Sequence, residues 1–522
     1  MNTLYYGDNL DNLRKLKDET VDLCYIDPPF NSKRSYNQIY NNTGGEDKAQ
    51  TEAFQDTWSW RNAEAEVGFQ EILCNERGRY SVQTVELIKG LEKVLTKGPL
   101  LAYLVSMTRR VAEIHRVLKP TGSFYLHCDP TSSHYLKLML DGIFCARGGD
   151  FLNELDWCYS IGGKSKDAFG RKHDVILLFT KSNGGHTFNQ SGATIARKPN
   201  SHMKVGNDPD GREFQEKRDR KSGKVYRYYL DEGKIAEDYW TDIETLNRED
   251  RERLGYPTQK PEALMQRIIK TSSNEGDVVL DAYCGCGTTI AVAQRLNRTW
   301  IGMDITYQSI SLILRRLGKE LAATVRQDGV PRDMASAEQL AHKKDDRCRK
   351  EFEKWAVLTY TENRAAINNK KGADAGIDGT AYFWTGTDTN ATMVFQVKSG
   401  QVERGDIAKL KGDMEREKAA MATLITLREP SPQMRSEARM AGFYELLGKR
   451  FDRVRIVTVK EIIEGGKRLE LLLRDPISDH TRPPVPDVDQ MDLTLLPAKE
   501  DMVIPIAPGR ERKPAAKRKR IA

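Results

Sequence analysis

The sequence predicts an α/β protein whose main sheet is mostly parallel and covered by helices on both faces. Short apolar runs rich in β-branched and aromatic residues, typical of buried strands, lie at 21–26, 123–128, 174–179, 277–284 and 299–305. Helical patterns lie between them, the clearest being an apolar stripe with spacings of three and four, formed by Leu104, Met107, Val111, Ile114 and Leu118. Strand and helix therefore alternate, and ligands of such doubly wound sheets sit at the carboxyl ends of the strands.

Length and composition indicate a protein of several domains with a nucleic acid as a fitting partner. The 522 residues exceed one ordinary core, and a net charge of +7 favours an acidic partner. No apolar run approaches the roughly 18 to 20 residues of a membrane helix. The N-terminus has neither the basic nor the apolar part of a signal peptide, so we expect a cytoplasmic protein that does not span a membrane.

Changes in composition divide the chain. We expect one domain at 1–320, with a polar, charged insertion at 183–255 on its ligand-binding edge. A charged helical linker at 321–345 leads to a second, smaller αβ pattern at 346–465. Residues 466–522, rich in proline and charge, are predicted to form a basic tail without a fixed fold.

The eight cysteines form no disulfide framework. The closest pair, Cys284 and Cys286, flanks a glycine but has neither a second pair nor histidines at metal spacing. The sequence therefore does not favour a zinc site.

A glycine loop late in the first domain is typical of a nucleotide-type ligand. The run VVLDAYCGCGTTIAVAQRL reads as a strand, a tight turn and a helix, and Gly285 and Gly287 let the backbone approach a ligand at the helix N-terminus. A dinucleotide fingerprint requires a third glycine where this chain has Ile290, which disfavours NAD. Asp304 ends the next strand at the usual separation for a carboxylate that binds ribose hydroxyls. One adenosyl ligand would satisfy both features.

The segment LCYIDPPFNS ends the first apolar run with an acid, two prolines and an aromatic residue. The prolines cannot continue a strand ladder, so they stiffen the turn that carries Asp27 and Phe30. The glycine loop, counted from Asp281, follows this turn by 281 − 27 = 254 residues, whereas an ordinary doubly wound domain has that loop on its first strand. The order predicts a circularly permuted sheet.

These features resemble the DNA amino-methyltransferases of the beta arrangement, which modify adenine N6 or cytosine N4. The resemblance covers about residues 1 to 320 and rests on seven blocks in the family's order: YYGDNL, IDPPF, RVLKPTGSFYLH, FGRKHDVILLFTKS, YPTQKPEALMQRII, LDAYCGCGTT and WIGMDI. The departures are Tyr283, Ala282 and Tyr256, where phenylalanine, proline and histidine are usual. None of them removes a functional group.

The resemblance implies a permuted Rossmann-like fold that binds S-adenosyl-L-methionine (AdoMet) and double-stranded DNA, with 183–255 as target-recognition region. It implies that the catalytic turn consists of Asp27, Pro28, Pro29 and Phe30. It implies that the AdoMet site includes Asp281, Tyr283, Gly285 and Gly287, with Asp304 on the ribose, Asp8 near the adenine ring, and Thr258 and Lys260 at the methionine end. Adenine N6 is favoured because the family's cytosine members more often carry serine at position 27, but the turn alone does not exclude cytosine N4.

The second αβ pattern resembles the restriction endonuclease-like superfamily in its D…QxK form. Asp378 ends one strand-like run, and Gln396 and Lys398 lie in the next. The resemblance implies that Asp378 and Gln396, with Glu353 as the helix acid, bind Mg²⁺ while Lys398 supports the attacking water. A working nuclease, a degenerate DNA-binding relative and an unrelated αβ domain all remain open.

Three classes of function stay open. The first is a DNA adenine methyltransferase with a nuclease-like appendage, as in a restriction-modification system on one chain. The second is a Mg²⁺-dependent DNA endonuclease whose methylase fold only recognises sequence. The third is a binding protein with neither activity.

Overall fold

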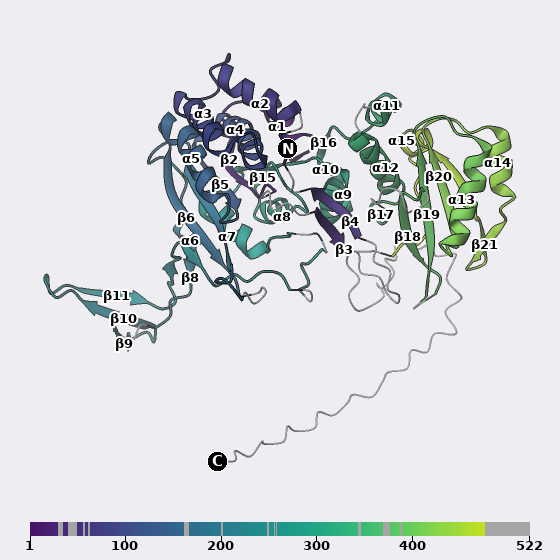
Figure 1. Cartoon of the computed structure of the whole chain (residues 1–522). Helices are drawn as coiled ribbons and strands as arrows, with labels where there is room; N and C mark the ends of the chain where they lie inside the picture. Colours follow the sequence, from purple (N-terminus) through teal and green to yellow (C-terminus); the bar gives the residue numbers. More distant parts are fainter. Residues whose placement is uncertain are drawn as a thin grey trace. The chain divides into compact units, whose positions relative to one another are not determined.

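A nine-stranded sheet dominates the N-terminal part of the chain in the computed structural model (Figure 1). The structure describes residues 1–29, 35–39, 50–55, 58–60, 63–160, 166–199, 202–247, 250–254, 256, 258–342, 346–368, 376–386 and 389–474. Residues 1–482 form one compact unit. In the described range, no helix is both long and apolar enough to cross a membrane.

The order of the nine strands explains the permuted sequence. From edge to edge the strands are β13 (Tyr239–Trp240), β6 (Asp150–Cys158), β7 (His173–Thr180), β5 (Leu118–Cys128), β2 (Val21–Ile26), β14 (Val278–Asp281), β15 (Thr299–Asp304), β1 (Thr3–Tyr6) and β16 (Arg326–Asp328). All neighbours pair in parallel except β7, which is antiparallel to both β5 and β6. The early strand β2 and the late strand β14 are adjacent, with Leu23 opposite Val279. This confirms the predicted circularly permuted α/β fold.

Helices cover both faces of this sheet because the strand side chains alternate between two cores. Cys24, Phe124 and Leu280 belong to one core, and their chain neighbours Tyr25, Tyr125 and Val279 belong to the other. The first core includes side chains of α1 (Asn9–Lys15), α2 (Ala63–Cys74), α3 (Val82–Leu95), α4 (Pro99–Val117) and α5 (Ser133–Ile143). The second includes side chains of α7 (Glu262–Ser272), α8 (Thr288–Arg295), α9 (Tyr307–Leu317) and α11 (Met334–His342). The predicted apolar stripe lies on α4 from Leu104 to Ile114, whereas its last predicted member, Leu118, begins β5.

A small antiparallel sheet occupies the predicted insertion at 183–255. It consists of β9 (Lys204–Asn207), β10 (Glu213–Arg218) and β11 (Val225–Tyr229), and we call these three strands the arm. Figure 1 shows the arm as a sheet of its own. Short elements at its base are α6 (Gln190–Ala193), β8 (Thr194–Ile195) and β12 (Lys234–Ile235), and a separate pair is β3 (Ser35–Ile39) with β4 (Gln50–Gln55).

A second sheet organises the C-terminal part, in the order β17 (Ala366–Ile367), β18 (Gly379–Trp384), β19 (Asn390–Lys398), β20 (Met421–Thr426) and β23 (Val454–Thr458). The strands from β17 to β19 pair antiparallel, and those from β19 to β23 pair parallel. Its helices are α12 (Asp346–Tyr360), α13 (Arg404–Arg416), α14 (Pro432–Arg439) and α15 (Val459–Ile463), and a hairpin joins β21 (Phe443–Leu446) to β22 (Lys449–Asp452).

Two segments differ from the sequence interpretation. The predicted linker at 321–345 contains β16, which extends the first sheet beside β1, and α11; the end of α10 (Lys319–Thr324) also falls in it. A three-residue edge strand is too short to give a periodic signal. At the start of the predicted tail, Leu469 and Leu473 are buried, and the Arg474 amide donates to the Tyr382 carbonyl, so this stretch packs on the second sheet. The rest of the predicted tail, from 475, lies outside the described residues.

Candidate functional site

The turn after β2 places a carboxylate beside a lysine from a distant segment. Lys260 Nζ donates to Asp27 Oδ2 at 2.5 Å, and the Lys260 side chain is only 10% exposed. Pro28 is buried and Pro29 half-buried, so the turn is fixed against the protein, whereas Phe30 lies outside the described residues. The sequence interpretation put Lys260 at the methionine end of AdoMet, and the structure adds a direct ion pair with Asp27.

The glycine loop lies next to this turn because β14 and β2 are neighbours. Gly285 and Gly287 have φ of 48° and 74°, in the left-handed region that favours glycine. A Cβ on Gly287 would lie 2.6 Å from Ile313 Cγ1 of α9. Glycine is therefore required at position 287 for two reasons, its backbone conformation and the close approach of α9.

Two acids flank the loop, and their ionisation is disfavoured. Burial raises the pKa of Asp281 to about 7, and the carboxylates of Asp27 and Asp304 contribute to this rise. Burial also raises the pKa of Asp304 to about 6, although the Gly285 amide donates to Oδ2 and the Thr306 amide to Oδ1, each at 2.9 Å. A positively charged ligand near these acids would relieve this cost.

The remaining predicted AdoMet residues lie around the same loop or close to it. Asp8 caps α1 through the Leu10 amide and is ion-paired with Arg110 at 2.9 Å. The next residue, Asn9, donates to the Ala282 carbonyl at 2.8 Å, so this segment contacts the loop. Asp8 thus has a structural role that accounts for it without a ligand.

Tyr283 and Thr258 complete the predicted set. The Tyr283 hydroxyl lies 3.6 Å from Met107 Sδ, and its amide donates to Asp281 Oδ1 at 3.0 Å. Thr258 is exposed and has a φ of 61°, an uncommon conformation for a residue other than glycine. It lies two residues before Lys260, so the backbone conformation that positions the lysine includes this strained residue.

Sequence reasoning missed a polar chain beside the Asp27 turn. The Tyr25 hydroxyl lies 2.8 Å from His127 Nδ1, and His127 Nε2 lies 3.0 Å from Asp174 Oδ2. Tyr159 donates to the other Asp174 oxygen at 3.2 Å. These residues come from β2, β5 and β7 and from the end of β6, so no short motif contains them. Of the seven sequence blocks, however, one ends at His127 and another contains Asp174.

The residues present fit AdoMet. Two acids with raised pKa suit the sulfonium and ribose, and Asp304 accepts the Gly285 amide and so orders the glycine loop. When bound, AdoMet would supply an activated methyl group. Asp281, Gly285, Gly287 and Asp304 would hold it.

The predicted nuclease-like residues gather where β18 begins and β19 ends, with Glu353 on α12; Asp378 directly precedes β18 and does not end a strand as predicted. Burial and the neighbouring Glu353 carboxylate raise the pKa of Asp378 to about 7, and its Oδ2 accepts the Val397 amide at 2.6 Å. Gln396 donates to the Gly376 carbonyl at 2.9 Å. Gln396 Oε1 is buried and lacks a hydrogen-bond partner among the described residues.

This second group fits Mg²⁺ incompletely. Lys398 Nζ lies 3.2 Å from Oδ1 of Asp406, a residue of α13. This ion pair compensates the lysine charge that would otherwise support an attacking water. Within the described residues, no three histidine, cysteine or acidic side chains are arranged to hold a metal ion. The orphaned Gln396 oxygen is the feature that a cation would satisfy.

Two family models match the chain. One, for a family described as DNA methylase, matches residues 21–315, more than half of the chain. The other, for a family described as NACHT-associated inactive restriction endonuclease 1, matches residues 349–464. The second match confirms that the C-terminal domain is restriction endonuclease-like.

Curated relatives are methyltransferases. DNA adenine methyltransferase YhdJ of Escherichia coli (strain K12) is 26% identical over 325 residues, which are 60% of this chain and 82% of that protein. Type II methyltransferase M.HpaI of Haemophilus parainfluenzae is 31% identical over 221 residues, 42% of this chain and 60% of that protein. The chain thus spans less than two thirds of M.HpaI.

Solved structures give weaker likenesses. A putative DNA modification methylase of Thermus thermophilus, complexed with S-adenosyl-L-methionine, has a TM-score of 0.35 and 16% identity, over 63% of this chain and 100% of that one. The cytosine-N4-specific PvuII DNA methyltransferase has a TM-score of 0.36 and 13% identity, over 62% of this chain and 94% of that one. Such values carry no argument about the base that is modified.

Proposed function

The chain belongs to the DNA methylase family, and on that premise we propose that it transfers a methyl group from AdoMet to N6 of adenine in double-stranded DNA. The observation that carries the proposal is the juxtaposition of Asp27 with the glycine loop, at the ends of adjacent strands. Each half alone suits many ligands. Together they support a site in which a hydrogen-bond acceptor for the base amine would lie next to the methyl group of bound AdoMet.

Asp27 is the orienting acceptor in this proposal. The exocyclic amine of adenine is a poor nucleophile because its lone pair is delocalised into the ring. If the Asp27 carboxylate and the Pro28 carbonyl each accept one N–H, the nitrogen can pyramidalise toward the methyl group, and proximity lowers most of the remaining barrier. The amine would give up one proton, to Asp27 or to solvent, as the methyl group leaves the sulfonium. Lys260 fixes the rotamer of Asp27 and offsets its charge before the base arrives. The base must first leave the duplex, at a cost of about a few kcal/mol.

Adenine is preferred to cytosine on two grounds. Position 27 is aspartate, where the family's cytosine members more often have serine, and the relative YhdJ is named as an adenine methyltransferase. Cytosine N4 is the alternative, since it offers the same kind of amine.

The test uses tritiated AdoMet and unmodified duplex DNA. We expect label in N6-methyladenine, and loss of at least about 1,000-fold in rate with Asp27→Ala. Label in N4-methylcytosine would instead support the alternative, cytosine N4 methylation. Asp18→Ala is the control, since Asp18 is an exposed acid ion-paired on the surface with Arg116.

We propose further that residues 183–255 form the target-recognition region and that one face of the arm contacts DNA. Cross-strand pairing puts Phe214 opposite Tyr229 and Glu216 opposite Arg227, on one face. On this face Arg227 stacks 3.8 Å from the centre of the Phe214 ring and is ion-paired with Glu216 at 2.7 Å. Its charge is already compensated.

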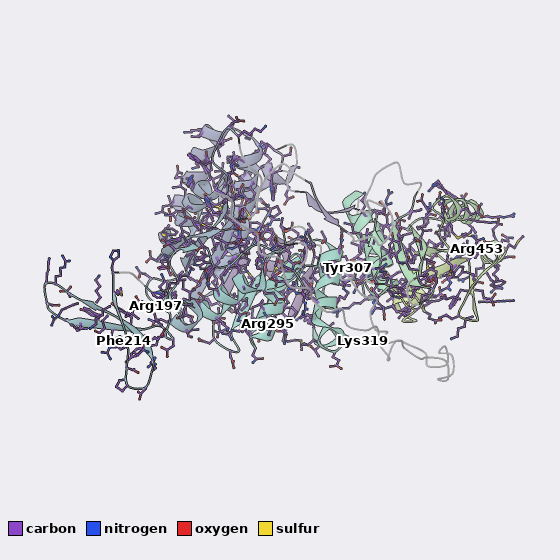
Figure 2. The ribbon with its side chains drawn as sticks, turned by 90° about the horizontal axis from the view of Figure 1, so that it is seen from below. Arg197, Phe214, Arg295, Tyr307, Lys319 and Arg453 are labelled. Carbon is purple, nitrogen blue, oxygen red and sulfur yellow. The ribbon has the colours of Figure 1, made fainter. Side chains whose placement is uncertain are left out.

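The opposite face differs. Lys217 lies opposite Tyr226, and Lys224 Nζ lies 5.2 Å from the Tyr226 ring centre. Among the described residues, neither lysine has an acidic partner within salt-bridge distance. Arg197 stacks 4.9 Å from the centre of the ring of Tyr228, which lies on this face too, and Figure 2 marks Arg197 and Phe214 in this part of the chain. Uncompensated cations beside aromatic rings suit phosphates and bases.

The double variant Lys217→Ala/Lys224→Ala tests this face. We expect weaker DNA binding and a salt dependence reduced by about two ion releases, because each phosphate contact contributes a slope of about 0.9. Arg227→Ala, on the compensated face, is the matched control. Equal effects of the two variants would contradict the assignment.

A Mg²⁺-dependent nuclease is the second candidate function, for the C-terminal domain, and would make the chain a restriction-modification enzyme. The unsatisfied Gln396 oxygen beside Asp378 favours it, whereas the match to a family described as inactive weighs against it. Nicking of unmethylated DNA in Mg²⁺ that is lost in Asp378→Ala and Lys398→Ala, and retained in Asp27→Ala, would support it. Absence of nicking in Mg²⁺ and Mn²⁺ alike would leave a DNA-contacting domain.

A further inference from the structure

A carboxylate from the restriction endonuclease-like domain holds the segment that follows Asp304. Glu351, on α12, accepts the backbone N–H of Tyr307 at 2.8 Å and the Tyr6 hydroxyl at 3.3 Å, both on Oε2. Lys354 Nζ donates to the other oxygen at 2.8 Å. Glu351 is buried, with 9% of its surface exposed. A buried carboxylate with three donors is a strongly directed contact.

The contact satisfies a specific donor at the start of α9. The cap residue Thr306 accepts the Ser309 amide, but the Tyr307 amide, in the first turn, has no partner within its own helix. Glu351 supplies that partner, and its negative charge is favourable at a helix N-terminus. Figure 2 marks Tyr307 at the start of this helix.

The same carboxylate also reaches the other side of the Asp304 segment. Tyr6 ends β1, and its ring meets the Tyr307 ring edge to face at 5.8 Å. The next residue, Gly7, donates its amide to the Asp304 carbonyl at 2.9 Å. Glu351 therefore ties together two segments that bracket Asp304.

We propose that Glu351 is a positioning residue of the AdoMet site, so that the C-terminal domain sets the affinity of the methylase domain for its cofactor. The inference rests on the proposed role of Asp304. The Asp304 side chain holds the Gly285 and Thr306 amides at once, so a shift at the start of α9 moves the acid and the glycine loop together. Glu351 itself touches no ligand.

The experiment measures AdoMet binding to the full chain by calorimetry, without DNA. We expect Glu351→Ala to weaken binding about 10-fold and Glu351→Gln, which keeps one carbonyl acceptor, about threefold. Thr359→Val is the matched control. It removes another contact of the same helix, between the Thr359 and Tyr307 hydroxyls at 3.2 Å, and should leave affinity unchanged.

Steady-state rates separate positioning from a general loss of structure. We expect KM for AdoMet to rise in Glu351→Ala while kcat at saturating AdoMet and KM for DNA stay within about twofold. Amide exchange should be faster at Tyr307 in this variant. If Glu351→Ala does not fold, the test rests on Glu351→Gln, for which we expect the roughly threefold loss of AdoMet affinity given above.

Two negative results are distinguishable. Unchanged AdoMet affinity in a folded Glu351→Ala or Glu351→Gln would overturn the inference and leave the proposed function intact. Failure of the wild-type chain to bind AdoMet would overturn the proposed function and this inference with it. Equal losses in Thr359→Val would show that any contact of this helix matters, which contradicts a specific role for Glu351.

Discussion

Both domains place acids next to strand termini, yet the two groups differ in their neighbours. In the methylase domain, Asp27 faces Lys260, and Asp304 accepts the Gly285 amide of the glycine loop. In the restriction endonuclease-like domain, Asp378 faces another acid, and Lys398 is drawn to Asp406. The difference teaches that acids at strand ends do not make a site by themselves. What matters is whether the surrounding donors are left for a ligand or are used within the protein.

Alanine at glycines of the two sites should show the largest contrast. In Gly287→Ala, the added Cβ meets Ile313 at 2.6 Å, so we expect AdoMet affinity to fall about 100-fold. In Gly376→Ala, the Cβ meets the Gln396 amide nitrogen at 2.7 Å, and we expect a loss of stability with normal AdoMet affinity. Gly276→Ala is the matched control, because its φ of 83° gives the same strain in open space. Calorimetry and thermal unfolding check all three.

Substitution of a lysine in each site, Lys260 and Lys398, should give the next largest contrast. Lys260→Met removes the lysine that is ion-paired with the half-buried Asp27, and we expect the methylation rate to fall about 10- to 100-fold. Lys398→Met should leave methylation within about twofold, since its partner Asp406 belongs to the other domain. Initial rates with both substrates saturating make the comparison. A similar fall in both variants would mean that the lysines act through folding.

The change of AdoMet affinity with pH should be smaller than the effects of the glycine and lysine substitutions. The pKa values of Asp281 and Asp304 are raised to about 7 and 6, so both acids bind protons near neutrality in the free protein. A positively charged ligand favours the ionised forms, so binding should release protons and tighten as pH rises through 6 to 7, then level off. Asp281→Asn should remove the upper part of this rise. Calorimetry in two buffers of different ionisation enthalpy counts the protons, and their uptake on binding would contradict the assignment.

Asp378→Asn should give the smallest effect, a gain in stability. Because the folded pKa of about 7 exceeds the ordinary value, the folded protein holds an extra proton between about pH 4 and 7, and stability falls as pH rises through that window. Asparagine cannot ionise, so we expect the unfolding temperature to rise by about 2–4 °C at pH 8 and little at pH 4. A lower unfolding temperature at pH 8 in the presence of Mg²⁺ would instead point to a metal held by Asp378.

The sequence predicts the parts of this molecule that depend on local pattern. The strand runs, the stripe on α4, the stiff turn at Asp27 and the positive φ of Gly285 and Gly287 all follow from residue type and spacing. The permuted order follows because parallel strands bring their carboxyl ends to one edge of the sheet. Assignment of roles to these residues stays a prediction.

Pairings across long separations could not be predicted in the same way. Lys260 and Asp27 are 233 residues apart, and Tyr25 and His127 are 102 apart, and no periodic signal joins them. In the sequence, Glu351 is one of several charged residues of α12, and nothing local distinguishes it; only the fold shows that it is buried. Such contacts depend on how strands, loops and helices assemble in the fold, which local sequence patterns do not encode.

The hydrophobic cluster that contains Tyr307 and Ile313 of α9 continues without a break into Phe352 and Trp355 of α12. A cut at either end of the predicted linker, 321–345, would therefore expose apolar surface on both halves. In chimaeras that exchange the C-terminal half between relatives, α9 and α12 would have to come from the same parent. Evolution could separate two domains joined only by a flexible chain more easily than these two, which share an apolar cluster.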